Sequence, residues 1–265
     1  MRKRFISILL CGIMAMSLVA CGKSKGDMKK NETTQNSIEE TSENIENETV
    51  VNEQPSKVID TEVSYSYETG ENPDEATRNI TTYLYNEKGD VISVNDSSET
   101  VTYEYEYDDK GNCTNKKEYI DGELSYEEVY KFDDNKNIIY TDCYYHYNNS
   151  ECVTFEYEYN DDNQLIKESR TNADIYVEYL YDGDKLVLEK EYNNSNMSSY
   201  IEYEYENNLL IKETSYFSEY EEGEEFYCDS YTEYEYDSDG YMIKKIECVD
   251  EDYFYVSEYK YKTVQ

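Results

Sequence analysis

The chain has 265 residues, with 61 acidic against 24 basic side chains and a net charge of −37. This balance excludes nucleic acid as a general partner, because phosphate binding needs clustered Lys and Arg. Tyrosine occurs 34 times, tryptophan is absent and proline occurs twice, so tyrosine must supply most of the area that folding buries.

The first 20 residues have the parts of a secretory signal. Arg2, Lys3 and Arg4 form a cationic start, which fits the inside-positive preference of membrane insertion. Residues 5–20 are an almost uncharged apolar run, at the short end for a spanning helix and with the flanks of a signal peptide. The sequence therefore predicts export and removal of residues 1–20.

The apolar run ends in Leu18, Val19, Ala20 and Cys21, which resembles the lipobox of bacterial lipoproteins. In that family the cysteine receives diacylglycerol, cleavage follows, and the cysteine becomes the first residue. The resemblance implies that Cys21 carries acyl chains of the palmitate type and anchors the chain in the cell membrane, on its extracytoplasmic face. Two or more acyl chains hold a protein on a bilayer stably. The alternative is an ordinary cleaved signal followed by a coincidental cysteine.

Two features describe the setting of this anchor. Abundant Asn, Lys, Glu, Ile and Tyr are typical of a low-GC Gram-positive genome, which would place the mature chain on the outer surface.

Residues 21–60 are polar and lack a helical or strand period, which predicts a disordered, flexible linker. As a coil it would span about 35 Å. The alternative is an amphipathic helix through Ile38, Ile45 and Val50, whose apolar positions are sparse.

Residues 61–265 contain seven copies of one tyrosine-rich unit. Each copy has alternating tyrosines, a turn rich in Asp and Asn, a Gly or Asn, and then an apolar pair. The aromatic residues that precede the seven turns are Tyr85, Tyr107, Phe132, Tyr159, Tyr181, Tyr205 and Tyr236. The units at Tyr181 and Tyr205 are one residue shorter in the turn. The spacing varies after the apolar pair, so the turns are constant and the loops between units differ.

Each unit has the pattern of a β-hairpin. Alternation of Tyr with Glu has a period of two, which predicts a strand with two unlike faces. The Asp-rich turn has type I chemistry, and Gly111 can take a positive φ in a bulge. In this register we expect Tyr107 opposite Cys113 and Glu104 opposite Lys116.

The expected fold class is all-β. Tandem antiparallel hairpins should give fifteen or sixteen strands in one long twisted or spiral meander sheet, in which each unit packs only on its neighbours. Residues 63–67 form an extra leading strand and residues 259–261 a trailing one that closes the last edge. Tyr rings can cover apolar neighbours while their hydroxyls stay wet, which predicts a thin sheet with both faces partly solvated.

The repeat resembles the YD repeats of the RHS family over residues 63–261. Residues 105–113 and 234–242 are the nearest copies of Tyr-x-Tyr-Asp-x-x-Gly-x-apolar. RHS proteins form coiled β-sheet shells; large members enclose toxins or sit at cell surfaces, and some bind carbohydrate. For this chain the resemblance implies a short, open spiral sheet, and it offers no catalytic residues.

Signals for catalysis, cofactors and metals are weak. His146 is the only histidine, and neither a Ser-His-Asp arrangement nor a phosphate loop is present. Residues 237–240 resemble the start of a calcium loop but lack its bidentate Glu, and hairpin turns use the same residue types. We therefore predict a non-enzymatic protein with no cofactor and no metal site.

Five cysteines remain after Cys11 leaves with the signal and Cys21 takes lipid. An odd number argues against a full disulfide framework. The residue at 113 occupies an apolar position of its unit and is expected in the core. Two pairs are placed to bridge a hairpin: Cys143 with Cys152, and Cys228 with Cys248.

The sequence thus favours a lipid-anchored, extracytoplasmic binding or scaffold module for an envelope protein or glycan. An immunity or accessory lipoprotein of a toxin system is one alternative, and it depends on the RHS resemblance alone. A purely structural envelope protein is the other. The membrane, through Cys21, is the one partner assigned to a residue.

Overall fold

The computed structural model describes residues 57–146, 152–218, 225–249 and 252–263. The predicted signal segment (residues 1–20), the predicted lipid-accepting Cys21 and most of the expected linker (residues 21–60) lie outside these residues. Contacts divide the chain into one unit spanning Val58–Lys262 and a second containing Met1–Lys57 and Thr263–Gln265; the architecture below is that of Val58–Lys262. In the described ranges no helix is long and apolar enough to cross a membrane.

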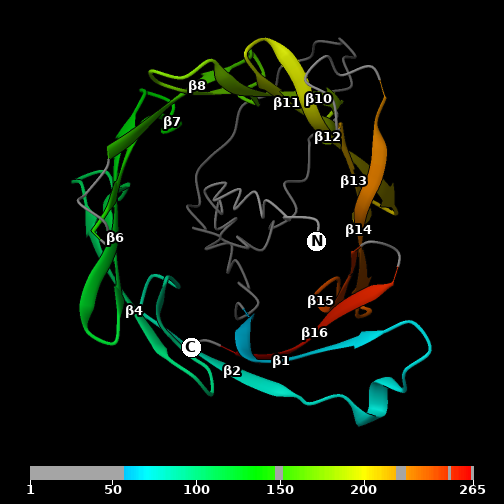
Figure 1. Cartoon of the computed structure of the whole chain (residues 1–265). Coiled ribbons are helices and arrows are strands. Elements are labelled where there is room, and N and C mark those ends of the chain that lie inside the picture. Colours follow the sequence, from blue (N-terminus) through cyan, green and yellow to red (C-terminus); the bar gives the residue numbers. More distant parts are fainter. Residues whose placement is uncertain (1–56, 147–151, 219–224, 250–251, 264–265) are drawn as a thin grey trace, which may run out of the picture. The chain divides into compact units, whose positions relative to one another are not determined.

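Sixteen antiparallel strands make up the fold (Figure 1), which confirms the expected all-β chain of fifteen or sixteen strands. The strands are β1 (Lys57–Glu68), β2 (Asn79–Tyr85), β3 (Val91–Asn95), β4 (Thr100–Tyr107), β5 (Cys113–Ile120), β6 (Glu123–Phe132), β7 (Ile138–Tyr145), β8 (Cys152–Tyr159), β9 (Leu165–Arg170), β10 (Ile175–Asp182), β11 (Lys185–Asn193), β12 (Asn196–Glu206), β13 (Leu209–Phe217), β14 (Tyr227–Tyr236), β15 (Met242–Val249) and β16 (Tyr253–Thr263). One short 3-10 helix, η1 (Pro73–Glu75), lies between β1 and β2.

The expectation of an open spiral sheet is wrong, because the sheet closes into a barrel. Strand β1 is hydrogen-bonded to β2 on one side and to β16 on the other, so the first and last strands meet. An open meander would leave a row of unpaired backbone groups on each of these two edges, and pairing them satisfies both rows. Closure depends on the tilt and stagger of the strands, which the hairpin motif does not specify.

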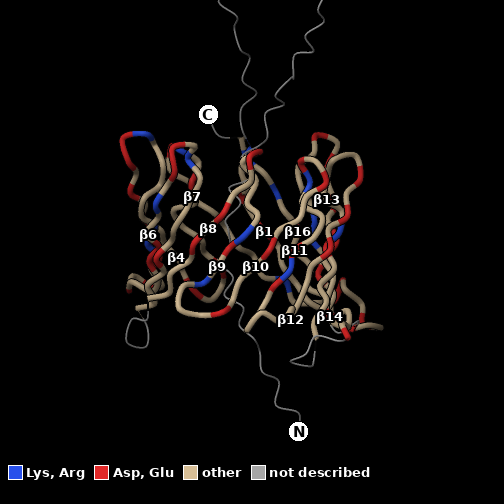
Figure 2. The backbone as a smooth tube through the Cα atoms, turned by 90° about the horizontal axis from the view of Figure 1, so that it is seen from above, with Lys and Arg blue, Asp and Glu red and all other residues tan. Residues whose placement is uncertain are grey.

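The seven repeat turns all lie at one rim of the barrel. In an antiparallel meander, connections alternate between the two ends of the strands, and each repeat turn joins an even-numbered strand to the next odd-numbered one. We call this end the repeat-turn rim. Figure 2 shows acidic and basic residues at the hairpin tips along its upper edge. The repeat therefore presents seven charged tips side by side.

The repeat turns are built by the side chain that begins them. In the β4–β5 turn, Asp108 Oδ1 accepts hydrogen bonds from the backbone N–H groups of Lys110 (2.9 Å) and Asn112 (2.8 Å). Gly111 has φ +83° and donates to the carbonyl of Asp108 at 3.0 Å. The same turn recurs with Asn86, Asp133, Asn160 and Asp237 in the first position. The short side chains of Asp and Asn form such local hydrogen bonds readily, so these residues of the motif stabilise the turns.

The predicted register is confirmed at the turn and is wrong by one residue further along. Tyr107 pairs with Cys113 as expected, but Glu104 pairs with Lys117, and Lys116 lies opposite Tyr105. A β-bulge next to Tyr107 causes the shift, because a bulge places two residues of one strand against one of the other.

The sheet has two unlike faces. The tyrosine face carries the alternating tyrosines of the motif, such as Tyr103 and Tyr105, which are half-buried; the glutamate face carries the alternate Glu104 and Glu106, which are exposed. Fully buried apolar side chains are few: among the described residues they are Cys143, Cys248 and Val256. The wall is thus a single layer with partly solvated faces.

Candidate functional site

The turn that resembles a calcium loop uses its carboxylate for structure. Asp237 Oδ1 accepts from the backbone N–H groups of Asp239 and Tyr241, both at 2.9 Å. These contacts match those of the other repeat turns. Within the described ranges, no three or more His, Cys, Asp or Glu side chains converge as a metal site.

All five described cysteines are free thiols, and neither expected bridge is formed. Cys143 pairs with Val153, whereas Cys152 pairs with Tyr144, the next residue along β7. Successive residues of a strand point to opposite faces, so Cys143 and Cys152 diverge. Cys113 is half-buried rather than fully enclosed.

The second expected bridge fails because of register. Cys248 lies opposite Tyr231 on β14, and Cys228 pairs with Tyr216 on β13. Symmetry about the turn in sequence therefore does not bring the two thiols opposite each other.

His146 is exposed at the end of β7. Its Nε2 lies 3.7 Å from a carboxylate oxygen of Glu127, and its backbone N–H donates to the carbonyl of Ser125 at 2.9 Å. No described serine hydroxyl bonds to the ring. His146 and Glu127 thus form a pair of neighbouring polar side chains at the surface.

In two of the repeat units the second tyrosine of the motif joins its hairpin to the preceding one through a backbone carbonyl. The Tyr159 hydroxyl donates to the carbonyl of Ile138 at 2.7 Å, and Tyr236 bonds Leu210 in the same way at 2.7 Å. Tyr261, on the last strand, repeats the contact at 2.7 Å. Each of these carbonyls belongs to the first or second residue of the strand that follows the preceding turn. The hydroxyls of Tyr159, Tyr236 and Tyr261 therefore tie neighbouring hairpins together.

A row of carboxylates crosses the tyrosine face on every second strand. Glu168 lies on β9, Glu189 on β11 and Glu213 on β13, and the Tyr203 hydroxyl donates to Glu189 at 2.9 Å. Burial, followed by the nearby charge of Glu189, raises the pKa of Glu168 to about 7. Burial likewise raises the pKa values of Glu189 and Glu213.

Two other carboxylates of this face have cationic partners. Lys116 lies 3.5 Å from Glu128, and Lys245 lies 3.6 Å from Glu247. The row from Glu168 to Glu189 makes no such ion pair among the described residues. Burial and the neighbouring carboxylates therefore favour the protonated form at Glu168 and Glu189.

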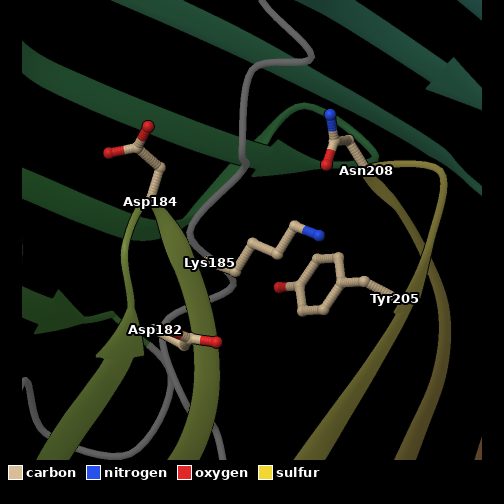
Figure 3. Close-up of a pocket in the computed structure, with 5 residues that line it drawn as sticks. All are labelled: Asp182, Asp184, Lys185, Tyr205 and Asn208. Atoms are coloured by element: carbon tan, nitrogen blue, oxygen red, sulfur yellow. The ribbon is translucent and has the colours of Figure 1, made fainter.

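A pocket of about 420 Å³ lies at the repeat-turn rim, between the β10–β11 and β12–β13 tips. Asp182, Asp184, Lys185, Tyr205 and Asn208 line it (Figure 3). The ammonium group of Lys185 lies 5.3 Å from the centre of the Tyr205 ring, within the range of a cation–π contact. Two carboxylates, an ammonium group, an amide and an aromatic ring thus belong to the residues that line this opening.

Tight turns hold the pocket residues. Asp182 pairs with Lys185 across a two-residue turn, and Glu206 pairs with Leu209 across another. In the second turn Asn207 and Asn208 have φ +50° and +66°, the left-handed backbone that a type I′ hairpin requires.

Neighbouring tips support this region from one side. The Gln164 side chain donates to the carbonyl of Gly183 at 2.7 Å. One turn further back, the amides of Asn137 and Asn163 exchange hydrogen bonds of 2.6 and 2.9 Å. The pocket therefore lies next to hairpin turns that are hydrogen-bonded to one another.

Sequence reasoning missed this pocket, although a signal was present. The units at Tyr181 and Tyr205 are the two with a shortened turn, and they are consecutive. A shorter turn lacks the Asx loop and so leaves a gap between two tips. Which side chains line that gap depends on the packing of adjacent hairpins.

No family model matches the sequence, and neither does any curated protein. Solved structures give distant likenesses. The Tc holotoxin pore of Photorhabdus luminescens aligns at 13% identity and a TM-score of 0.31 over 76% of this chain, which spans 11% of that chain's length. The TcdB2–TccC3 complex aligns at 10% identity and a TM-score of 0.28, over 69% of this chain and 15% of that one.

A porin-like protein from Bacteroides uniformis aligns at 11% identity and a TM-score of 0.35, over 77% of this chain and 98% of that one. Toxin-complex and porin-like chains are thus both among the structural neighbours. TM-scores this low carry no argument about function.

Proposed function

We propose that this chain is a lipid-anchored binding module on the extracytoplasmic face of the cell membrane, and that its repeat-turn rim contacts an envelope protein or glycan. The observation that carries the proposal is the polar pocket between the β10–β11 and β12–β13 tips. Binding residues are commonly placed on loops held by a rigid scaffold, and a closed barrel is such a scaffold.

The charges of the pocket support a binding role. Asp182, Asp184 and Lys185 make no ion pair with other described residues, although charges of both signs are close by. Unpaired polar groups on a fixed surface can be satisfied by a ligand at little ordering cost. The exposed carboxylates of the glutamate face give the remaining wall a solvated surface.

The anchor in this proposal is Cys21. Replacement Cys21→Ala should move the protein from the membrane fraction to the soluble extracytoplasmic or secreted fraction, and remove the acyl mass from the mature N-terminus. Membrane retention of Cys21→Ala would contradict lipid anchoring through this residue and leave the rim proposal to be judged separately.

The rim is tested by co-sedimentation of the full chain, purified in detergent, with isolated cell envelopes. The variant Asp184→Asn/Lys185→Gln removes one charge of each sign from the pocket. The matched control Asp109→Asn/Lys110→Gln removes the same charges from the β4–β5 tip. Retention of the wild type and the control, with loss in the pocket variant, would support the proposal. Absence of wild-type retention, or equal retention of both variants, would count against it.

A further inference from the structure

We propose that an aromatic patch at the rim opposite the repeat-turn rim binds a cationic peptide segment of a partner protein. This inference goes beyond the proposed function, because it concerns the other end of the barrel. The aromatic patch consists of Phe217, Tyr227, Tyr253 and Tyr255, whose exposed fractions lie between 43% and 50%. Exposed aromatic side chains that lie together, unlike scattered ones, mark interaction sites.

Strand pairing places these four side chains at one end and on one face of the sheet. Phe217 ends β13 and pairs with Tyr227 at the start of β14. Tyr253 begins β16, and its ring centre lies 6.4 Å from that of Tyr255. Strands β13 to β16 are consecutive in the barrel (Figure 1), so β14 and β16 are about 10 Å apart. The registers between these strands place all four side chains on the tyrosine face.

Two carboxylates are fixed at the edges of the patch by its own tyrosines. The hydroxyl of Tyr253 donates a hydrogen bond to Glu68, and that of Tyr227 donates to Glu225 at 2.7 Å. An ionised carboxylate can accept about four hydrogen bonds, so Glu68 and Glu225 can each accept from a further donor. An incoming cation would therefore meet a ring and a carboxylate side by side.

Further acidic side chains make this end of the sheet anionic. Glu247 pairs with Tyr255 across β15 and β16, and the exposed Asp252 precedes the first residue of β16. Lys245 lies 3.6 Å from Glu247 and offsets one of these charges. The charge around the patch is thus complementary to a basic partner.

The protein itself already uses the contact that the patch would make with a partner. The guanidinium group of Arg78 lies 4.0 Å from the centre of the Tyr65 ring, which is a cation–π contact. Among the described residues, no Lys or Arg lies over the ring of Tyr253 or Tyr255. Their exposed faces can therefore accept a Lys or Arg side chain from another protein.

Charge also argues against the other occupants of such a patch. A second copy of this chain carries the same net charge of −37, and nucleic acid and anionic lipid are repelled in the same way. A wholly apolar partner would remove the carboxylates from water without pairing them, which is costly. A segment rich in Lys or Arg meets none of these penalties.

The size of the patch fits a short segment. An aromatic side chain offers about 200 Å², so four half-exposed ones offer about 400 Å² of contact area. A standard interface between folded proteins buries about 800 Å² on each partner. The patch is therefore better matched to a peptide segment than to a whole folded surface.

The test is the fluorescence anisotropy of labelled octa-arginine, titrated with the full chain in detergent at about 0.15 M salt. Octa-glutamate and octa-serine are the acidic and neutral probes, and choline is the small cation. Tyr253→Leu/Tyr255→Leu should weaken octa-arginine binding about tenfold, because two cation–π contacts are lost. Tyr253→Phe/Tyr255→Phe keeps both rings and should stay within about twofold of the wild type.

Charge variants separate the patch from the general acidity of the chain. Glu225→Gln/Glu247→Gln should weaken octa-arginine binding about fivefold, whereas Glu104→Gln/Glu106→Gln, on the exposed glutamate face of β4, should weaken it less than about twofold. Equal losses in these two variants, or no loss in the leucine variant, would overturn the proposal. It would also be overturned by octa-serine or octa-glutamate binding as tightly as octa-arginine, by tighter binding of choline, or by a wild-type dimer that Tyr255→Leu dissociates.

Discussion

The ammonium group of Lys262, on the last strand, lies 3.1 Å from the carboxylate of Asp60 on the first strand. The same group donates a 3.1 Å hydrogen bond to the carbonyl oxygen of Tyr83 on β2. One side chain therefore links the three strands at which the two ends of the sheet meet. The Tyr67 ring stacks on Phe254 at 5.0 Å across the same seam. The register between β1 and β2 comprises four residue pairs, and the bond from Lys262 to the Tyr83 carbonyl adds a side-chain link to β2 beside this short pairing.

Replacement of Lys262 should loosen this seam. Lys262→Met keeps the length of the side chain and removes the ammonium group, so the bond to the Tyr83 carbonyl, worth about 1 kcal/mol, is lost. For a barrel of this size the unfolding midpoint should fall by about 2–4 °C. The matched control is Lys260→Met, two residues earlier on β16. Equal midpoints for the two variants, measured by thermal circular dichroism, would contradict a specific role for Lys262.

The tyrosine that bonds the preceding hairpin should contribute through its hydroxyl. Tyr236→Phe removes the 2.7 Å bond to the Leu210 carbonyl and keeps the ring. We expect a loss of about 1 kcal/mol in the free energy of unfolding, measured by urea titration. Tyr255→Phe, at an exposed tyrosine, is the control and should change stability little. A larger effect at Tyr255 than at Tyr236 would reject the lateral bond as the reason for the repeated tyrosine.

Stability should fall as the pH rises through neutrality. The folded pKa of Glu168 is raised to about 7, by burial first and by the Glu189 charge second. A carboxyl group with a raised folded pKa stabilises the fold fully below its unfolded pKa of about 4.3, and this contribution is lost as the pH rises through about 7. Denaturant titrations at pH 5 and pH 8 should differ by up to about 3 kcal/mol from this group.

Two variants show whether Glu168 causes this dependence. Glu168→Gln mimics the protonated form and should flatten the profile between pH 5 and pH 8. Glu158→Gln, on the exposed glutamate face of β8, should leave the profile unchanged. A wild-type protein that is more stable at pH 8 than at pH 5 would contradict the assignment.

The first residue of a repeat turn should matter for stability and not for calcium. Asp237→Ala removes the acceptor for two backbone N–H groups and should destabilise the fold by about 1–2 kcal/mol. Asp237→Asn keeps an oxygen in the same place and should be close to the wild type. Addition of Ca²⁺ should not shift the unfolding midpoint of either protein, and a calcium-dependent rise lost in Asp237→Asn would show that the turn binds the ion.

The hairpins could be predicted from the sequence because their determinants are local. Alternating Tyr and Glu around Tyr105 specify a two-faced strand, and Asp108 with Gly111 specifies the turn between β4 and β5. The register near the turn follows from these residues, as the Tyr107–Cys113 pair shows. Beyond the bulge the predicted pairing is wrong by one residue, because Glu104 pairs with Lys117 and not with Lys116. The motif contains no residue type that indicates the extra residue of the bulge.

Closure and the pocket were not predictable in the same way. The contact of Lys262 with Asp60 joins positions about 200 residues apart, and it depends on strand tilt summed over the whole sheet. The contact of Lys185 with Tyr205 likewise joins two different hairpins. The two shortened turns in the sequence coincide with the position of the pocket. The identity of the side chains that line it depends on how the neighbouring hairpin turns pack, which the sequence motif does not specify.

The central claim, that the repeat-turn rim binds at the pocket, is tested most directly by amide hydrogen exchange with and without isolated cell envelopes. The account predicts slower exchange at residues 182–185 and 207–208, at the tips of β10–β11 and β12–β13, and little change in the described connections of the opposite rim, such as residues 171–174 and 194–195. Protection confined to that opposite rim, or no protection at either tip despite retention on the envelope, would contradict it.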